Sequence, residues 1–145
     1  MTLNEILSNW SKDCDIDRTE LAEESLRTIS LHAKYIRWYK EEKLKLIKLK
    51  HEYKKLYLEK YEFYSMGPSK ETKDLGWEMP ARGAIIKAEV PIYIDADKEL
   101  IDANLRIAMA QEKVELLQDI VKEVQNRRWA IKSAIEWHKW VSGGG

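Results

Sequence analysis

Apolar side chains recur every three or four residues along most of this sequence, the spacing that places them on one face of an α-helix. The first such segment is short. Thr2 and Glu5 form the pattern of a capping box, in which each side chain accepts a hydrogen bond from the other residue's backbone N–H. The apolar positions that follow predict an amphipathic helix over residues 3–12: Leu3, Ile6, Leu7 and Trp10.

A much longer helix is predicted next, because no Gly or Pro occurs between the caps Asp17 or Thr19 and the pair Gly67-Pro68. A helix over about residues 19–64 would be roughly 70 Å long. Its apolar residues fall on two arcs, so we expect two packing partners, one of them a neighbouring subunit. One arc holds Leu31, Tyr35, Trp38, Leu46, Leu49, Tyr53, Leu56 and Tyr64; the other holds Ile29, Ala33, Ile36, Leu44, Ile47 and Leu58.

Residues 65–94 differ in composition, since they hold all three prolines and three of the six glycines. They predict an irregular connector, and the alternation of Val90, Ile92 and Ile94 within 84–94 is typical of a strand or an extended arm. Asp95 or Asp97 then caps a last long helix. Its seam falls at heptad spacing, with Arg128 as a charge on it; the apolar positions are Ile107, Ala110, Val114, Leu117, Val121, Val124, Ile131 and Ile135.

The charge is unevenly distributed, although the formal net charge is +0. Residues 34–60 hold ten Lys or Arg and four Glu, a balance of +6, whereas residues 1–24 have a balance of −5. A basic helix rich in Tyr within a neutral chain indicates a polyanionic partner, most simply a nucleic acid.

Helical spacing divides the basic residues into two strips. One strip mixes Lys34, Arg37, Lys45, Lys48 and Lys55 with Glu41, Glu52 and Glu59, which is typical of a solvated face. The other is almost free of acids and predicts a single-strand contact, with ammonium groups along the phosphates and Tyr rings stacked on bases: Lys40, Lys43, Lys50, Lys54, Tyr57 and Tyr61. The alternative is that the lysines only keep the helix soluble and the tyrosines form its core.

A second basic cluster comprises Arg127, Arg128 and Lys132 beside Trp129, and predicts either an accessory anion contact or an interface. No metal-ligand set, phosphate-binding loop or catalytic constellation is present, so we expect no enzyme activity, cofactor or metal. The single cysteine, the absence of a signal-peptide pattern and the absence of a long apolar run predict a soluble intracellular protein without a membrane span.

The sequence resembles the UvsY family of recombination mediators from T-even-type phages. The matching segments occur in the same order and over nearly the whole chain: Leu3 with Ile6, Ile16-Asp17 followed by Thr19 and Leu21, Glu62-Phe63-Tyr64-Ser65, Ile94-Asp95-Ala96-Asp97-Lys98, and Arg128-Trp129-Ala130-Ile131-Lys132. The family's basic pair precedes the aromatic pair. Lys60 matches its second member, but Leu58 replaces the first, and Lys54 and Lys55 one turn earlier are the expected substitutes.

The resemblance implies a non-enzymatic mediator in the cytoplasm of an infected host cell. Such a protein binds single-stranded DNA, forms a ring-like hexamer or heptamer, and loads a recombinase of the UvsX type onto strands covered by single-strand binding protein. The fold class we expect is all-α, as one helical domain: a DNA-binding part over 1–66, a connector over 67–94, an oligomerising helix over 95–141 and a flexible tail over 142–145. The alternative is a structural or adaptor oligomer whose basic face binds an acidic protein.

Overall fold

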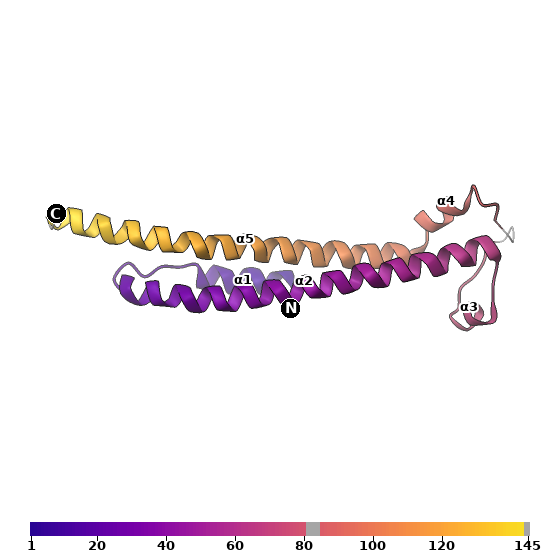
Figure 1. The fold of residues 1–145 in the computed structure, drawn as a ribbon, viewed down its shortest axis with the longest axis horizontal. Coiled ribbons are helices and arrows are strands. Elements are labelled where there is room, and N and C mark those ends of the chain that lie inside the picture. The colour runs from indigo at the N-terminus through magenta and orange to yellow at the C-terminus, as the bar shows by residue number, and fades with distance from the viewer. Residues whose placement is uncertain (81–84, 144–145) are drawn as a thin grey trace. The chain divides into compact units, whose positions relative to one another are not determined.

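The computed structural model describes residues 1–80 and 85–143, and the regular secondary structure within these residues is all α-helix. The helices are α1 (Leu3–Asp13), α2 (Leu21–Met66), α3 (Lys70–Asp74), α4 (Val90–Asp95) and α5 (Lys98–Val141). The all-α prediction with two long helices is therefore confirmed (Figure 1). None of the helices in the described part of the chain is long and apolar enough to cross a membrane.

Local signals set the helix ends. The capping box at Thr2 is formed, with Glu5 N–H donating to Thr2 Oγ1 at 3.1 Å and Thr2 N–H donating to Glu5 Oε2 at 2.8 Å. At the C-terminal end of α2, Gly67 has a φ of +91°, and its N–H donates to the carbonyl of Phe63 at 3.0 Å. Glycine adopts this left-handed conformation without steric cost, which explains why α2 ends there.

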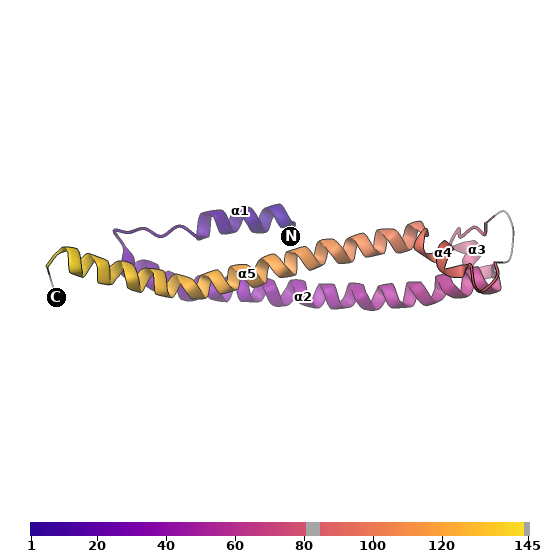
Figure 2. The same cartoon turned by 90° about the horizontal axis from the view of Figure 1, so that it is seen from above.

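The chain forms two compact units, which we describe separately: Met1–Leu44 with Ala110–Gly145, and Lys45–Met109. Both long helices pass through both units. In the first unit, α1 packs on α2 and α5 (Figures 1 and 2). Its core contains Ile6, Leu31, Tyr35, Leu117, Ile120, Val121 and Val124. The division into segments 1–66, 67–94 and 95–141 stays a prediction.

The second unit has its own core, in which α4 and the start of α5 pack against the end of α2. Its buried members are Phe63, Tyr64, Ile85, Val90, Ile94 and Leu100. Burial on this scale orders the short helix α4, which would not be stable alone.

The strand or arm predicted over 84–94 is wrong for the described residues, because Val90–Asp95 forms helix α4. Ala84 lies outside the described residues. Val90 and Ile94 are both buried, whereas Ile92 is 66% exposed. Residues four apart share a helical face, so Val90 and Ile94 lie on the buried face of a helix and Ile92 lies on another face.

The seam of α5 is confirmed over most of its length, but the charged position on it is Arg127. Arg127 is buried and Arg128 is exposed. A straight helix has 3.6 residues per turn, so a strict seven-residue repeat drifts around it over several turns. Counting in strict heptads therefore predicted Arg128 on the seam, one residue after the buried Arg127.

Replacing Leu117 with Ala should lower the free energy of unfolding by about 2–5 kcal/mol, because Leu117 is fully buried in the first core and its truncation leaves a cavity. Urea denaturation followed by circular dichroism measures this loss. Glu123→Ala, an exposed residue on the same helix, is the control and should change stability little. Equal losses in both variants would contradict the assignment of the core.

Candidate nucleic-acid interface

The lysines of the predicted strip are placed by α2, whose unbroken turns keep their side chains in solvent. Lys40 and Lys43 belong to the first unit and are exposed, with their ammonium groups 5.5 and 5.6 Å from the ring centre of Tyr39. These cation–π contacts leave both ammonium groups accessible. A phosphate could therefore reach them without breaking an ion pair.

In the second unit, Lys50, Lys54 and Lys55 are exposed and form no ion pair with any described residue. Tyr57 is 40% exposed and lies beside Tyr53, with a centroid separation of 6.2 Å. Tyr61 is half-buried and packs against the second core. Of the two tyrosines in the predicted strip, Tyr57 thus has the more accessible ring for stacking on a base.

The mixed strip contains cations that are already paired. Lys34 Nζ donates to Asp13 Oδ2 at 2.7 Å and to Asn9 Oδ1 at 3.2 Å, which ties α2 to α1. Lys48 lies 4.0 Å from Glu52 on the exposed surface. These pairs agree with the interpretation of this strip as separate from the candidate interface, with the exception of Lys55, which is exposed and forms no ion pair with a described residue.

Lys60 is in a different position from the other predicted contacts, because it is only 4% exposed. Its ammonium lies 3.1 Å from Asp97 Oδ2, 3.4 Å from Glu99 Oε1 and 4.0 Å from the ring centre of Trp77. A cation held this way stabilises the interior and cannot reach a phosphate without leaving its partners. We therefore leave Lys60 out of the interface, although the sequence placed it there.

Asp97 is the centre of this buried cluster. It caps α5 by accepting from the Leu100 N–H at 3.0 Å, and it accepts from the Tyr64 hydroxyl at 2.6 Å. Burial alone would raise the pKa of Asp97, but the hydrogen bonds from Tyr64, Leu100 and Lys60 outweigh it and hold the pKa below its usual value. Burial, together with the hydrogen bond to this carboxylate, raises the pKa of the Tyr64 hydroxyl.

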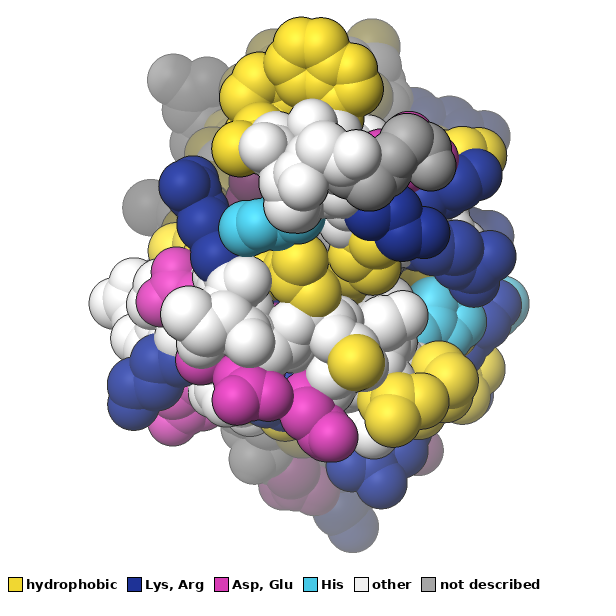
Figure 3. Space-filling model, turned by 90° about the vertical axis from the view of Figure 1, so that its left-hand side faces the viewer, with side chains coloured by type: hydrophobic (Ala, Val, Ile, Leu, Met, Phe, Trp, Pro, Cys, Tyr) yellow, Lys and Arg dark blue, Asp and Glu magenta, His cyan; other side chains and the backbone are white. Residues whose placement is uncertain are grey.

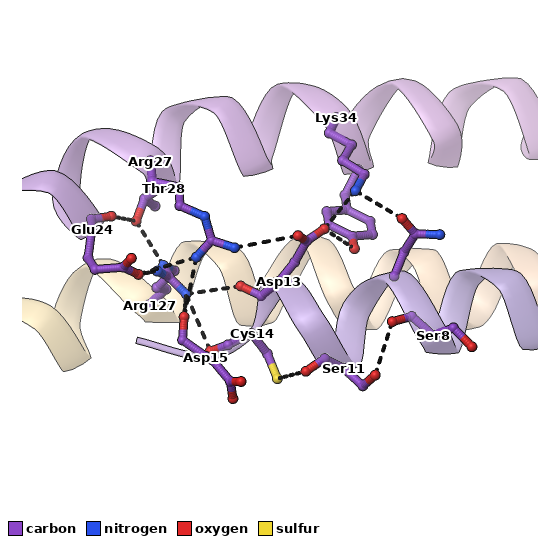
Figure 4. A network of polar contacts seen from close by, with 12 residues as sticks. Ser8, Ser11, Asp13, Cys14, Asp15, Glu24, Arg27, Thr28, Lys34 and Arg127 are labelled. Atoms are coloured by element: carbon purple, nitrogen blue, oxygen red, sulfur yellow. Dashed lines mark hydrogen bonds and ion pairs between the residues drawn. The ribbon is translucent and has the colours of Figure 1, made fainter. Parts of the chain in front are cut away.

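Arg127 has a comparable role in the first unit (Figure 4). Its guanidinium is buried, pairs with Glu24 and donates to Thr28 Oγ1 at 3.2 Å. It also donates to three backbone carbonyls at the end of α1 and directly after it, those of Asp13, Cys14 and Asp15, at 3.2, 3.3 and 3.1 Å. Five donors in a rigid fork suit this task, so Arg127 fixes the α1–α2 loop and is not part of an exposed anion site.

The second basic cluster is reduced to Arg128 and Lys132, which are exposed on α5. Lys132 Nζ lies 5.4 Å from the ring centre of Trp129, whose side chain is also exposed. Figure 3 shows hydrophobic side chains at the surface beside Lys and Arg side chains on one face. This combination fits either of the predicted roles, an anion contact or an interface.

Sequence reasoning missed the partners of Lys60 and Arg127. The only available signal was Asp97, which was recognised as a helix cap, while nothing in the spacing connects Glu24 to Arg127 across 103 positions. Among the described residues, no group of three or more His, Cys, Asp or Glu is arranged to hold a metal ion.

Replacing Lys60 with Met should lower the free energy of unfolding by about 3 kcal/mol, because it leaves the buried carboxylate of Asp97 without its cation. Urea denaturation tests this, with the exposed Lys54→Met as the matched control. If Lys60→Met is as stable as the control, Lys60 does not hold the second unit together.

Acid should destabilise the second unit through Asp97. A carboxyl whose folded pKa lies below its unfolded pKa contributes stability above the unfolded value, and this is lost as the pH falls through the folded value. Unfolding free energies measured from pH 6 down to about pH 2 should therefore decrease less steeply in Asp97→Asn than in the unmodified chain. Parallel curves would show that Asp97 does not carry this dependence.

Comparison with solved structures finds the same fold in the bacteriophage T4 recombination mediator protein UvsY. Its lattice type II crystal structure has a TM-score of 0.80 and 19% sequence identity, covering 98% of each chain. The lattice type IV structure has a TM-score of 0.79 and 17% identity, covering 97% of this chain and 98% of the other. No curated protein sequence matches the chain.

The sequence itself matches the profile of a family described as the recombination, repair and ssDNA binding protein UvsY. The match extends over residues 9–144 and so includes α2, α5 and all the candidate residues above. The chain belongs to the UvsY family of recombination, repair and single-stranded-DNA-binding proteins.

Proposed function

We propose that this protein is a non-enzymatic recombination mediator that binds single-stranded DNA through exposed lysines of α2. It would promote loading of a RecA-like recombinase of the UvsX type onto strands covered by single-strand binding protein, in the cytoplasm of an infected host cell. The observation that carries the proposal is the set of exposed α2 lysines, in a chain of a family that binds single-stranded DNA.

The proposed interface contains Lys40, Lys43, Lys50, Lys54 and Lys55, with Tyr57 as the stacking residue and Tyr61 beside it. Ammonium groups along a helix neutralise phosphates and release counterions, which gives affinity without sequence preference. A base stacked on Tyr57 would add about 1–3 kcal/mol. Arg128 and Lys132 are a candidate accessory contact on the first unit.

We further propose that the protein acts as a ring-like homo-oligomer, a hexamer or heptamer. Large apolar side chains exposed on both long helices support this, since a monomer gains nothing from leaving them in water: Leu26, Ile29, Leu44, Ile47, Leu58, Ile101, Leu105 and Met109. A strand that contacts several subunits binds with high avidity, because each later contact is intramolecular.

Replacing both Lys50 and Lys54 with Ala should weaken binding to an oligothymidylate and reduce the slope of log affinity against log salt. The expected reduction is about 0.7 per lost phosphate contact on a single strand. Fluorescence anisotropy across a salt series measures both quantities.

Lys122→Ala, an exposed lysine on α5, is the control and should leave the slope unchanged. A double variant with the slope of the unmodified protein would remove these lysines from the interface. If the double variant keeps its affinity for the strand but no longer binds an acidic protein, the result favours the adaptor alternative.

A further inference from the structure

The second unit contains a groove of about 370 Å³ between the last two turns of α2 and the segment that carries α3. Phe63 and Trp77 line it, with their rings in an edge-to-face arrangement and their centroids 5.5 Å apart. Trp77 is held from a second direction by the Lys60 ammonium, 4.0 Å from its ring centre. The aromatic lining is thus fixed before anything binds, which lowers the entropic cost of binding.

Two large apolar side chains of the groove remain in solvent. Met66 is 83% exposed and Leu75 is 62% exposed, although both lie next to a buried aromatic core. Exposed apolar side chains gathered around a concave site mark contacts with other molecules. Methionine is especially suited to such a site, because its flexible thioether adapts to the shape of a ligand.

The charge of the groove decides which class of molecule it fits. Glu59, Glu62 and Glu71 line it, all three are exposed, and none forms an ion pair with a described residue. These carboxylates repel a phosphate backbone, in contrast to the exposed Lys50 and Lys54 of the same unit. A cationic ligand would supply the missing partners of the three carboxylates.

We propose that this groove binds a cationic, apolar segment of a partner protein. An apolar side chain of the segment would pack on Phe63 and Trp77, between Met66 and Leu75. An adjacent Lys or Arg would pair with Glu59, Glu62 or Glu71. The negative charge of the groove favours a basic protein segment over a nucleic acid. This binding goes beyond strand binding and does not depend on it.

The four methionines of the chain make the groove observable in a large assembly. In protein labelled with ¹³C at the methionine methyl groups, an acetylated peptide of alternating leucine and arginine should shift the Met66 resonance. Met109, exposed on α5 and not part of the groove, is the internal control and should not move. The double variant Glu59→Gln, Glu62→Gln should bind this peptide about tenfold more weakly, as expected for roughly 1.4 kcal/mol of lost charge pairing.

Glu112→Gln, an exposed carboxylate on α5, is the matched variant and should bind like the unmodified protein. The proposal is overturned if Met66 does not respond to the peptide, or if the double variant binds it unchanged. It is also overturned if a glycine–arginine peptide shifts Met66 equally, because that would be ionic attraction alone. If an oligothymidylate shifts the Met66 resonance, the groove binds the strand and the proposal is overturned. If the protein binds no strand at all, that result contradicts the proposed function but leaves this proposal standing.

Discussion

The ion pair between Lys60 and Asp97 connects the two long helices within the second unit. Removing two charges from water is costly, and it is tolerated here because each group has several partners. The ammonium also contacts Glu99 and the Trp77 ring, and the carboxylate also accepts from Tyr64 and caps α5. The start of α5, the end of α2 and the Trp77 segment are therefore positioned by one buried cluster.

This cluster also constrains where a nucleic acid can bind. Lys60 is the residue that matched the family's basic pair, yet in this chain its charge is used inside the fold. The other member of that pair is Leu58, which carries no charge. In the proposed function, the positive charge offered to a strand comes instead from the exposed Lys40, Lys43, Lys50, Lys54 and Lys55, earlier in α2. The charge of Arg127 is likewise used inside the first unit, where its guanidinium holds the α1–α2 loop in place and does not bind an external anion.

Much of the fold follows from patterns that act over short distances. The capping box at Thr2, the end of α2 at Gly67 and the apolar seam of α5 all depend on neighbours within a few residues, so the sequence predicts them well. The helix at Val90–Asp95 was missed because tertiary burial of Val90 and Ile94 decides it. The partners of Lys60 and Arg127 were missed for a related reason. A lysine on a helix looks alike in sequence whether it is solvated or paired with a residue 37 positions away.

The central claim is that a single strand contacts the exposed face of α2 and not the buried cluster around Lys60. Photo-crosslinking with an oligonucleotide that contains 5-iododeoxyuridine, followed by mass spectrometry of the peptides, tests it most directly. The account predicts crosslinks to Tyr57 and to neighbouring residues of α2, with none to Trp77. Crosslinks at Trp77, without any on the Lys40–Tyr57 part of α2, would contradict it.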